Sequence, residues 1–329
     1  MNVLTFAEAM ECVEEGGKPS LLLGNGFSRA WNNDIFRYAS LLEAADFGDR
    51  DREIRDLFAR MGTADFESVM RAMVSARMVL NAYGDQEVLV AQVERDEQQL
   101  KDSLIEVLSR THPERPGEVT DIQYVAVRTF LSHFEQVFTV NFDLLYYWAR
   151  NMQLAPAGYR GDDGFREGAT WQGHGTKQNA HFLHGGLHLF DDGSSIRKHT
   201  FRANGNPIID QVQANLNIGK FPLFVAEPSS DKKLQRIRHN PYLNFCYHQL
   251  TTVTGTVFIH GHSIDANDQH IFDALKRSPA KQFFISIFGN EDTEDNRRAK
   301  ANARTYLESA GRTVDFFDAT SAPIWHQEQ

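Results

Sequence analysis

Four short segments of the sequence carry small, polar or histidine side chains directly after an apolar run. The first, SLLLGNGFS, takes three leucines into Gly24, Asn25, Gly26, Phe27 and Ser28. Two glycines one residue apart allow a tight turn and a close approach of the backbone to a bulky group. Ser28 stands where a helix N-cap is expected, so free N–H groups would face the turn and suit a phosphate. A strand-to-helix turn without a ligand explains this segment equally well.

The other three segments hold further residues that could do chemistry. They are Asn141 and Asp143 after VFTV, His184 and Gly185 after HFL, and Gly261, Ser263 and Asp265 after VFI. Taken singly, Asn141 and Asp143 are explained as helix caps, and His184 as a buried, hydrogen-bonded histidine. Their joint occurrence favours a shared crevice, because ligands bind at the carboxyl ends of strands in open α/β sheets.

Apolar runs alternate with amphipathic stretches along most of the chain. The predicted strands are Leu21–Leu23, Val137–Val140, His181–Leu183, Leu223–Val225, Val257–Ile259, Phe283–Phe288 and Val314–Phe317. Most of them are apolar on both faces, which is typical of a buried parallel sheet. The predicted helices include Phe142–Met152, Asp231–Val253, Asp268–Arg277 and Glu291–Ala310. This alternation predicts an α/β fold with a Rossmann-like, doubly wound, mainly parallel sheet.

Residues 50–110 show no strand pattern. Apolar residues recur there at three- and four-residue spacing, which predicts helices only. We therefore expect a single domain over residues 1–329 with an all-helical insertion at 50–110. Met70, Met73 and Met78 share one face of this insertion. Such faces more often pack on the core, but this one could also join the protomers of a homo-oligomer or contact a protein partner.

The composition restricts the class of protein. The formal net charge of the 329 residues is −10, which argues against a chain that mainly grips nucleic-acid backbone. Cys12 and Cys246 form no CxxC pair, so we expect neither a cysteine zinc site nor a disulfide framework. No apolar run approaches the roughly 20 residues that span a bilayer. We expect a cytoplasmic protein without membrane contact or direct nucleic-acid binding.

The order of the four segments resembles the sirtuin-like superfamily, which binds NAD on a Rossmann-like sheet. The family's Gly-x-Gly-x-Ser and Asn-x-Asp motifs are matched by Gly24–Ser28 and Asn141–Asp143. Its His-Gly and Gly-x-Ser motifs are matched by His184–Gly185 and Gly261–Ser263. Asp65–Glu67 also looks like a motif of the bacterial branch. Each motif is short, and the ordered set carries the resemblance.

Departures from the family pattern narrow what the resemblance implies. Deacetylating sirtuins usually carry alanine at the position of Asn25 and glutamine at the position of Val140, and they carry zinc-binding cysteines that this chain lacks. Their Gly-Ile-Pro-Asp-Phe-Arg segment is replaced by residues 29–34. The resemblance covers about residues 20–275 and implies the zinc-free bacterial branch, whose members hydrolyse NAD and often serve in antiphage defence.

Hydrolysis of NAD, as the substrate, to ADP-ribose and nicotinamide gives each segment a role. The reaction passes through an oxocarbenium-like centre with a leaving group that is already cationic, so it needs no strong acid. His184 would accept a proton, and Asn141 would orient water or a ribose hydroxyl. Asp143 would bind the carboxamide or orient Asn141. The residues assigned to NAD binding are Gly24, Asn25, Gly26, Phe27, Ser28, Gly185, Gly261, Ser263 and Asp265.

Three alternatives stay open at this point. A metal site could use His181, His184 and His188 with Asp191 and Asp192. We expect no metal, because His181 and His184 face opposite sides of a strand and a double glycine follows them. A dehydrogenase is disfavoured because the third glycine of the dinucleotide fingerprint is missing. A catalytically silent sensor that binds NAD or ADP-ribose would use the same pocket.

Overall fold

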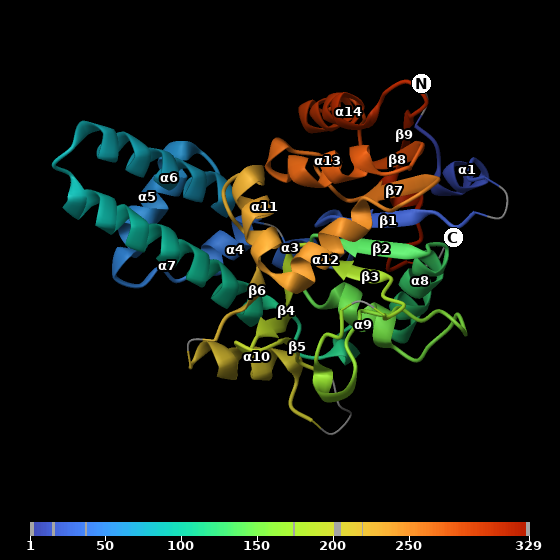
Figure 1. Cartoon of the computed structure of the whole chain (residues 1–329), viewed down its shortest axis with the longest axis horizontal. Coiled ribbons are helices and arrows are strands. Elements are labelled where there is room, and N and C mark those ends of the chain that lie inside the picture. The colour runs from blue at the N-terminus through green and yellow to red at the C-terminus, as the bar shows by residue number, and fades with distance from the viewer. Residues whose placement is uncertain are drawn as a thin grey trace.

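The central feature of the fold is a parallel sheet of six strands (Figure 1). The computed structural model describes residues 3–14, 17–36, 38–173, 175–200, 205–218 and 220–326. In spatial order the strands are β3 (Ala180–Phe182), β2 (Gln136–Thr139), β1 (Ser20–Leu23), β7 (Thr256–His260), β8 (Gln282–Ile287) and β9 (Thr313–Asp318). This is the doubly wound order 3-2-1-4-5-6, with its switch point between β1 and β7. The predicted fold class is confirmed.

The strand register aligns the places where four strands end. Leu23 in β1 is paired with Thr139 in β2 and with His260 in β7. Thr139 is in turn paired with Phe182 in β3. The four segments that carry the candidate residues therefore leave the sheet at the same level and on the same edge.

Helices connect most of the strands. They are α1 (Phe6–Glu11), α2 (Gly26–Trp31), α3 (Asn33–Phe36), α4 (Tyr38–Ala44), α8 (Asp121–Ser132), α9 (Leu145–Asn151), α10 (Ile208–Leu216), α11 (Ser230–His239), α12 (Pro241–Leu250), α13 (Gln269–Arg277) and α14 (Glu294–Leu307). The single helix predicted over Asp231–Val253 is two helices, α11 and α12. The break falls there because Pro241 has no N–H for a continuous helix, and Asn240 caps the first turn of α12.

Residues 50–110 fold as the predicted helical insertion. It contains α5 (Asp51–Met61), α6 (Phe66–Tyr83) and α7 (Glu87–Thr111), and α6 and α7 extend together away from the sheet (Figure 1). Met70 and Met73 are buried, whereas Met78 is 69% exposed. The expected methionine face is thus mostly part of the core. None of the described helices combines the length and apolar character needed to cross a membrane.

A second sheet of three antiparallel strands corrects one sequence prediction. It has the order β5 (Ile196–Lys198), β4 (Gly185–Asp191) and β6 (Pro222–Phe224). The run Leu223–Val225 was expected as a strand of the parallel sheet, but β6 pairs with β4 instead. A Cβ atom on Gly185 would lie 1.9 Å from the carbonyl oxygen of Leu223. This glycine, with φ +85°, lets the chain turn out of the parallel sheet and pair closely with β6.

Candidate functional site

The glycines after β1 are explained by contact with the segment after β7. Gly26 N–H donates to the carbonyl oxygen of Gly261 at 2.8 Å. A Cβ atom on Gly24 or Gly26 would lie 2.5 Å from backbone atoms of Gly261. Side chains at these positions would therefore force the two segments apart at the switch point. The turn shapes the edge of the sheet where ligands are expected.

The first turn of α2 differs from the expected anion site. Asn25, not Ser28, occupies the N-cap position, and Ser28 is the third residue of the helix. The N–H groups of Gly26, Phe27 and Ser28 all donate to protein carbonyl oxygens, at 2.8 to 3.1 Å. The expectation of free N–H donors for a phosphate is therefore not met. Phe27 is fully buried, with its ring 5.0 Å from that of Trp325.

Ser28, Asn141 and Asp143 form a buried polar group, the Ser–Asn–Asp cluster, at the ends of β1 and β2. Ser28 Oγ donates to Asp143 Oδ2 at 2.5 Å, and Asn141 Nδ2 donates to Ser28 Oγ at 3.1 Å. Asp143 Oδ1 also accepts the N–H of Leu145 at 2.9 Å. Burial raises the pKa of Asp143, and the hydrogen bonds from Ser28 and Leu145 oppose that rise. Asp143 thus accepts the N–H of the first residue of α9, although the N-cap position is Leu144 and the helix starts three residues after the predicted Phe142.

Asn141 is not explained by helix capping. Its side chain is buried, and among the described residues Oδ1 has no hydrogen-bond partner. A buried amide oxygen without a partner costs about 1–3 kcal/mol. The side chain is already held by the bond from Nδ2 to Ser28. Asn141 therefore offers one fixed, unused acceptor, which suits a hydroxyl group or a water molecule.

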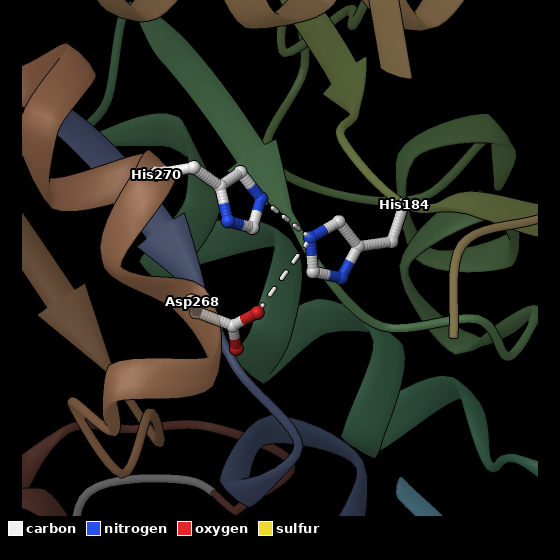
Figure 2. A group of neighbouring side chains, drawn as sticks. All are labelled: His184, Asp268 and His270. Atoms are coloured by element: carbon white, nitrogen blue, oxygen red, sulfur yellow. Dashed lines mark hydrogen bonds and ion pairs between the residues drawn. The ribbon is translucent and has the colours of Figure 1, made fainter. Parts of the chain in front are cut away.

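His184 belongs to a second buried group, the histidine cluster, defined as His184, Lys233, His262, Asp268 and His270. His184 Nε2 lies 3.3 Å from His270 Nε2 and 3.8 Å from Asp268 Oδ1 (Figure 2). Asp268 Oδ1 is 2.9 Å from Lys233 Nζ, and Oδ2 is 3.3 Å from His262 Nε2. His184 follows β3, His262 follows β7, Lys233 lies in α11, and the other two lie at the start of α13.

The histidine cluster contains one pair of opposite charges, the Asp268 carboxylate and the Lys233 ammonium. Burial lowers the pKa of His184 well below its usual value and that of His270 to about 4. Burial alone would raise the pKa of Asp268, but Lys233, His262 and His184 together hold it well below its usual value. His184 and His270 are therefore neutral imidazoles beside the Asp268 carboxylate, which also faces the ammonium group of Lys233.

A metal ion is geometrically conceivable at part of this cluster. The ligand atoms of His184, Asp268 and His270 all lie within 4.8 Å of one another, as in two-histidine, one-carboxylate metal sites. However, the ammonium of Lys233 lies 2.9 Å from the Asp268 oxygen that would bind the metal. Two cations that share one carboxylate oxygen repel each other in a buried site. The donor set thus fits a metal in number but not in charge.

The histidines considered as metal ligands from the sequence do not meet. His181 is held by Gln136 at 2.8 Å. His188 lies in β4 between the rings of Tyr147 and Phe182, at 4.2 and 4.6 Å. Of the three histidines in this run, His184 is the one that joins the cluster.

The remaining predicted residues lie outside both clusters. Ser263 is exposed, and Asp265 lies 3.5 Å from Arg298. Asn25 is exposed, and its Nδ2 donates to Phe36 O. Sequence reasoning missed four members of the histidine cluster, which are Lys233, His262, Asp268 and His270. The Asp-x-His spacing at 268–270, at the start of a predicted helix, is the signal that could have found two of them.

One protein-family model matches a part of the chain that contains both clusters. Residues 21–325 match the family model described as a domain of unknown function, DUF4917. The chain belongs to this family. The match includes both clusters and the helical insertion, and the description of DUF4917 assigns no activity. No curated protein matches the chain.

Proposed function

We propose that this chain binds NAD at the carboxyl edge of its parallel sheet and hydrolyses it to ADP-ribose and nicotinamide, as a sirtuin-like enzyme of the zinc-free bacterial branch. Asn141 is the observation that carries the proposal. It is buried directly after β2, is held by Ser28 after β1, and has an unused acceptor. A ribose hydroxyl or an attacking water would satisfy that oxygen.

The sheet supports a dinucleotide as the class of ligand. Dinucleotides bind across the switch point in sheets of this strand order. Segments from both halves of the sheet meet there, because Gly24 and Gly26 pack directly on Gly261. The glycines thus support the proposal by shaping the crevice, whereas the occupied N–H groups of α2 lend no support to a pyrophosphate at that helix.

The reaction needs few groups from the protein. A water oxygen bonds to the ribose carbon while the bond to nicotinamide breaks, and the bonding electron pair leaves with nicotinamide and neutralises its ring. The proton released by the water passes to His184, which is neutral near pH 7 because burial lowers its pKa. Asn141 orients the water or the ribose hydroxyl. The products are ADP-ribose, nicotinamide and one proton.

The test is to incubate the purified full chain with NAD and measure free nicotinamide. We expect release by the wild type and a loss of about a hundred- to ten-thousand-fold in His184→Ala, since a positioned base contributes that much. Asn141→Ala should also lose most of the rate. His181→Ala is the matched control: this histidine is equally buried on β3 but bonds to Gln136. It should keep the rate in folded protein.

Two results would contradict the proposal. In the first, calorimetry shows that the purified wild type binds NAD, but no nicotinamide is released by the purified protein or in phage-infected cells that express it. The chain is then a sensor. If His184→Ala and Asn141→Ala both hydrolyse NAD at the wild-type rate, the residue assignment is wrong.

A further inference from the structure

His184 presents only one of its ring nitrogens to the histidine cluster. Figure 2 shows Nε2 facing His270 and Asp268, while Nδ1 points away from both. A histidine that acts as a base needs one unprotonated ring nitrogen. The group that faces the other ring nitrogen decides which of the two carries the proton. The arrangement of donors and acceptors around Asp268 settles this for His184.

The bonds around Asp268 make its carboxylate an acceptor only. His262 Nδ1 accepts the N–H of Ile264 at 2.9 Å, so the proton of His262 lies on Nε2. That N–H faces Asp268 Oδ2 at 3.3 Å. The ammonium of Lys233 donates to Oδ1 at 2.9 Å. Both oxygens of Asp268 therefore carry negative charge toward the groups around them.

His184 must then carry its proton on Nε2, the nitrogen that faces Asp268. A bare Nε2 would place its lone pair 3.8 Å from the carboxylate, which is repulsive, whereas Nε2–H is attracted. With the proton there, His270 Nε2 accepts from His184 at 3.3 Å. The proton of His270 then lies on Nδ1 and is donated to Ser230 Oγ at 3.1 Å. Ser230 Oγ also accepts the backbone N–H of His270 at 2.7 Å, which fixes its position.

We propose that Asp268 and His270 are positioning residues that hold the proton of His184 on Nε2 and leave Nδ1 unprotonated. Nδ1 then accepts the proton that is released in hydrolysis. The use of Nδ1 as the base rests on the proposed function, but the choice of tautomer does not. When His184 becomes an imidazolium, Asp268 stabilises it from the Nε2 side, as the carboxylate does in acid–histidine pairs of hydrolases. Lys233 keeps the ionised carboxylate in place and supplies the charge that a metal would otherwise bring.

The tautomer is tested by nitrogen NMR on the full chain labelled with ¹⁵N-histidine, with the His184 signals assigned through His184→Ala. We expect the neutral Nε2–H form in the wild type. In Asp268→Asn the amide can turn an N–H toward His184, so the Nδ1–H form should gain population. A wild-type Nδ1–H form, or an unchanged tautomer in Asp268→Asn, overturns the proposal whether or not the chain hydrolyses NAD.

Kinetics test the role in hydrolysis. We expect Asp268→Asn to lower kcat for nicotinamide release by about ten- to a hundred-fold, a part of what a base contributes, with KM for NAD unchanged. Asp268→Glu should recover part of the rate, and Asp273→Asn, exposed on the same helix, should be neutral.

The pH profile separates positioning from simple damage. The acidic limb of kcat should move to lower pH in Asp268→Asn, because the carboxylate favours the imidazolium while Lys233, His262 and His270 oppose it. A uniformly lower rate without this shift would show a structural role only and contradict the proposal.

Two further experiments cover a variant that fails to fold and a metal ion bound at the cluster. If Asp268→Asn does not fold because Lys233 is left buried without a counter-charge, Lys233→Met/Asp268→Asn removes both charges and should fold, with the same slow rate. If the wild type binds one equivalent of Zn²⁺ or Mn²⁺ tightly and His270→Ala does not, the cluster is a metal centre and the proposal is wrong. A wild type without turnover but with the expected tautomer contradicts the proposed function alone.

Discussion

The two buried clusters at the edge of the sheet differ in whether all of their hydrogen-bond donors and acceptors have partners. In the Ser–Asn–Asp cluster, the bonds run from Asn141 through Ser28 to Asp143, and one acceptor on Asn141 is left over. In the histidine cluster, a carboxylate and an ammonium balance each other, and the donors and acceptors around Asp268 and His270 can all be matched. The first cluster is built to receive a polar group, and the second to orient one imidazole.

Because the charged pair lies in the histidine cluster, we expect the largest loss of stability when one of its two charges is removed. Lys233→Met leaves the largely buried Asp268 carboxylate without its ammonium partner, and loss of one partner of a buried pair costs about 3–5 kcal/mol. We expect the free energy of unfolding, measured in urea, to fall by that amount. Lys276→Met, which removes an exposed lysine from α13, is the control. A loss below about 1 kcal/mol, typical of exposed pairs, would show that the pair is not a structural centre.

A smaller loss is expected in the Ser–Asn–Asp cluster. Ser28→Ala removes the donor to Asp143 and the acceptor for Asn141, but Asp143 keeps the N–H of Leu145. A buried polar group that loses a partner costs about 1–3 kcal/mol. Ser75→Ala, on the exposed part of α6, controls for the loss of a hydroxyl group. If Ser28→Ala destabilises the chain more than Lys233→Met does, the contrast between the clusters is wrong.

The sequence allowed one cluster to be predicted and not the other for a physical reason. Ser28, Asn141 and Asp143 stand within five residues of a strand end, and parallel strands bring their ends together by register alone. His270 reaches His184, and Lys233 reaches Asp268, through the placement of α11 and α13, which depends on packing between helices. The N-cap role expected for Ser28 was wrong because α2 begins at Gly26, which makes Asn25 the N-cap and places Ser28 inside the helix. The strand over Leu223–Val225 was predicted correctly, but it was placed in the wrong sheet. The sequence did not indicate that Gly185 turns β4 out of the parallel sheet and lets it pair with β6.

The central claim is that both clusters serve one bound dinucleotide. The most direct measurement is a crystal structure of the folded His184→Ala chain, which should turn over slowly, grown with NAD. The account predicts one NAD molecule across the switch point, with a ribose hydroxyl or a water within about 3.2 Å of Asn141 Oδ1, and the bond to nicotinamide facing the space left by His184. A molecule of NAD that lies elsewhere, or no bound NAD at saturating concentration, would contradict it.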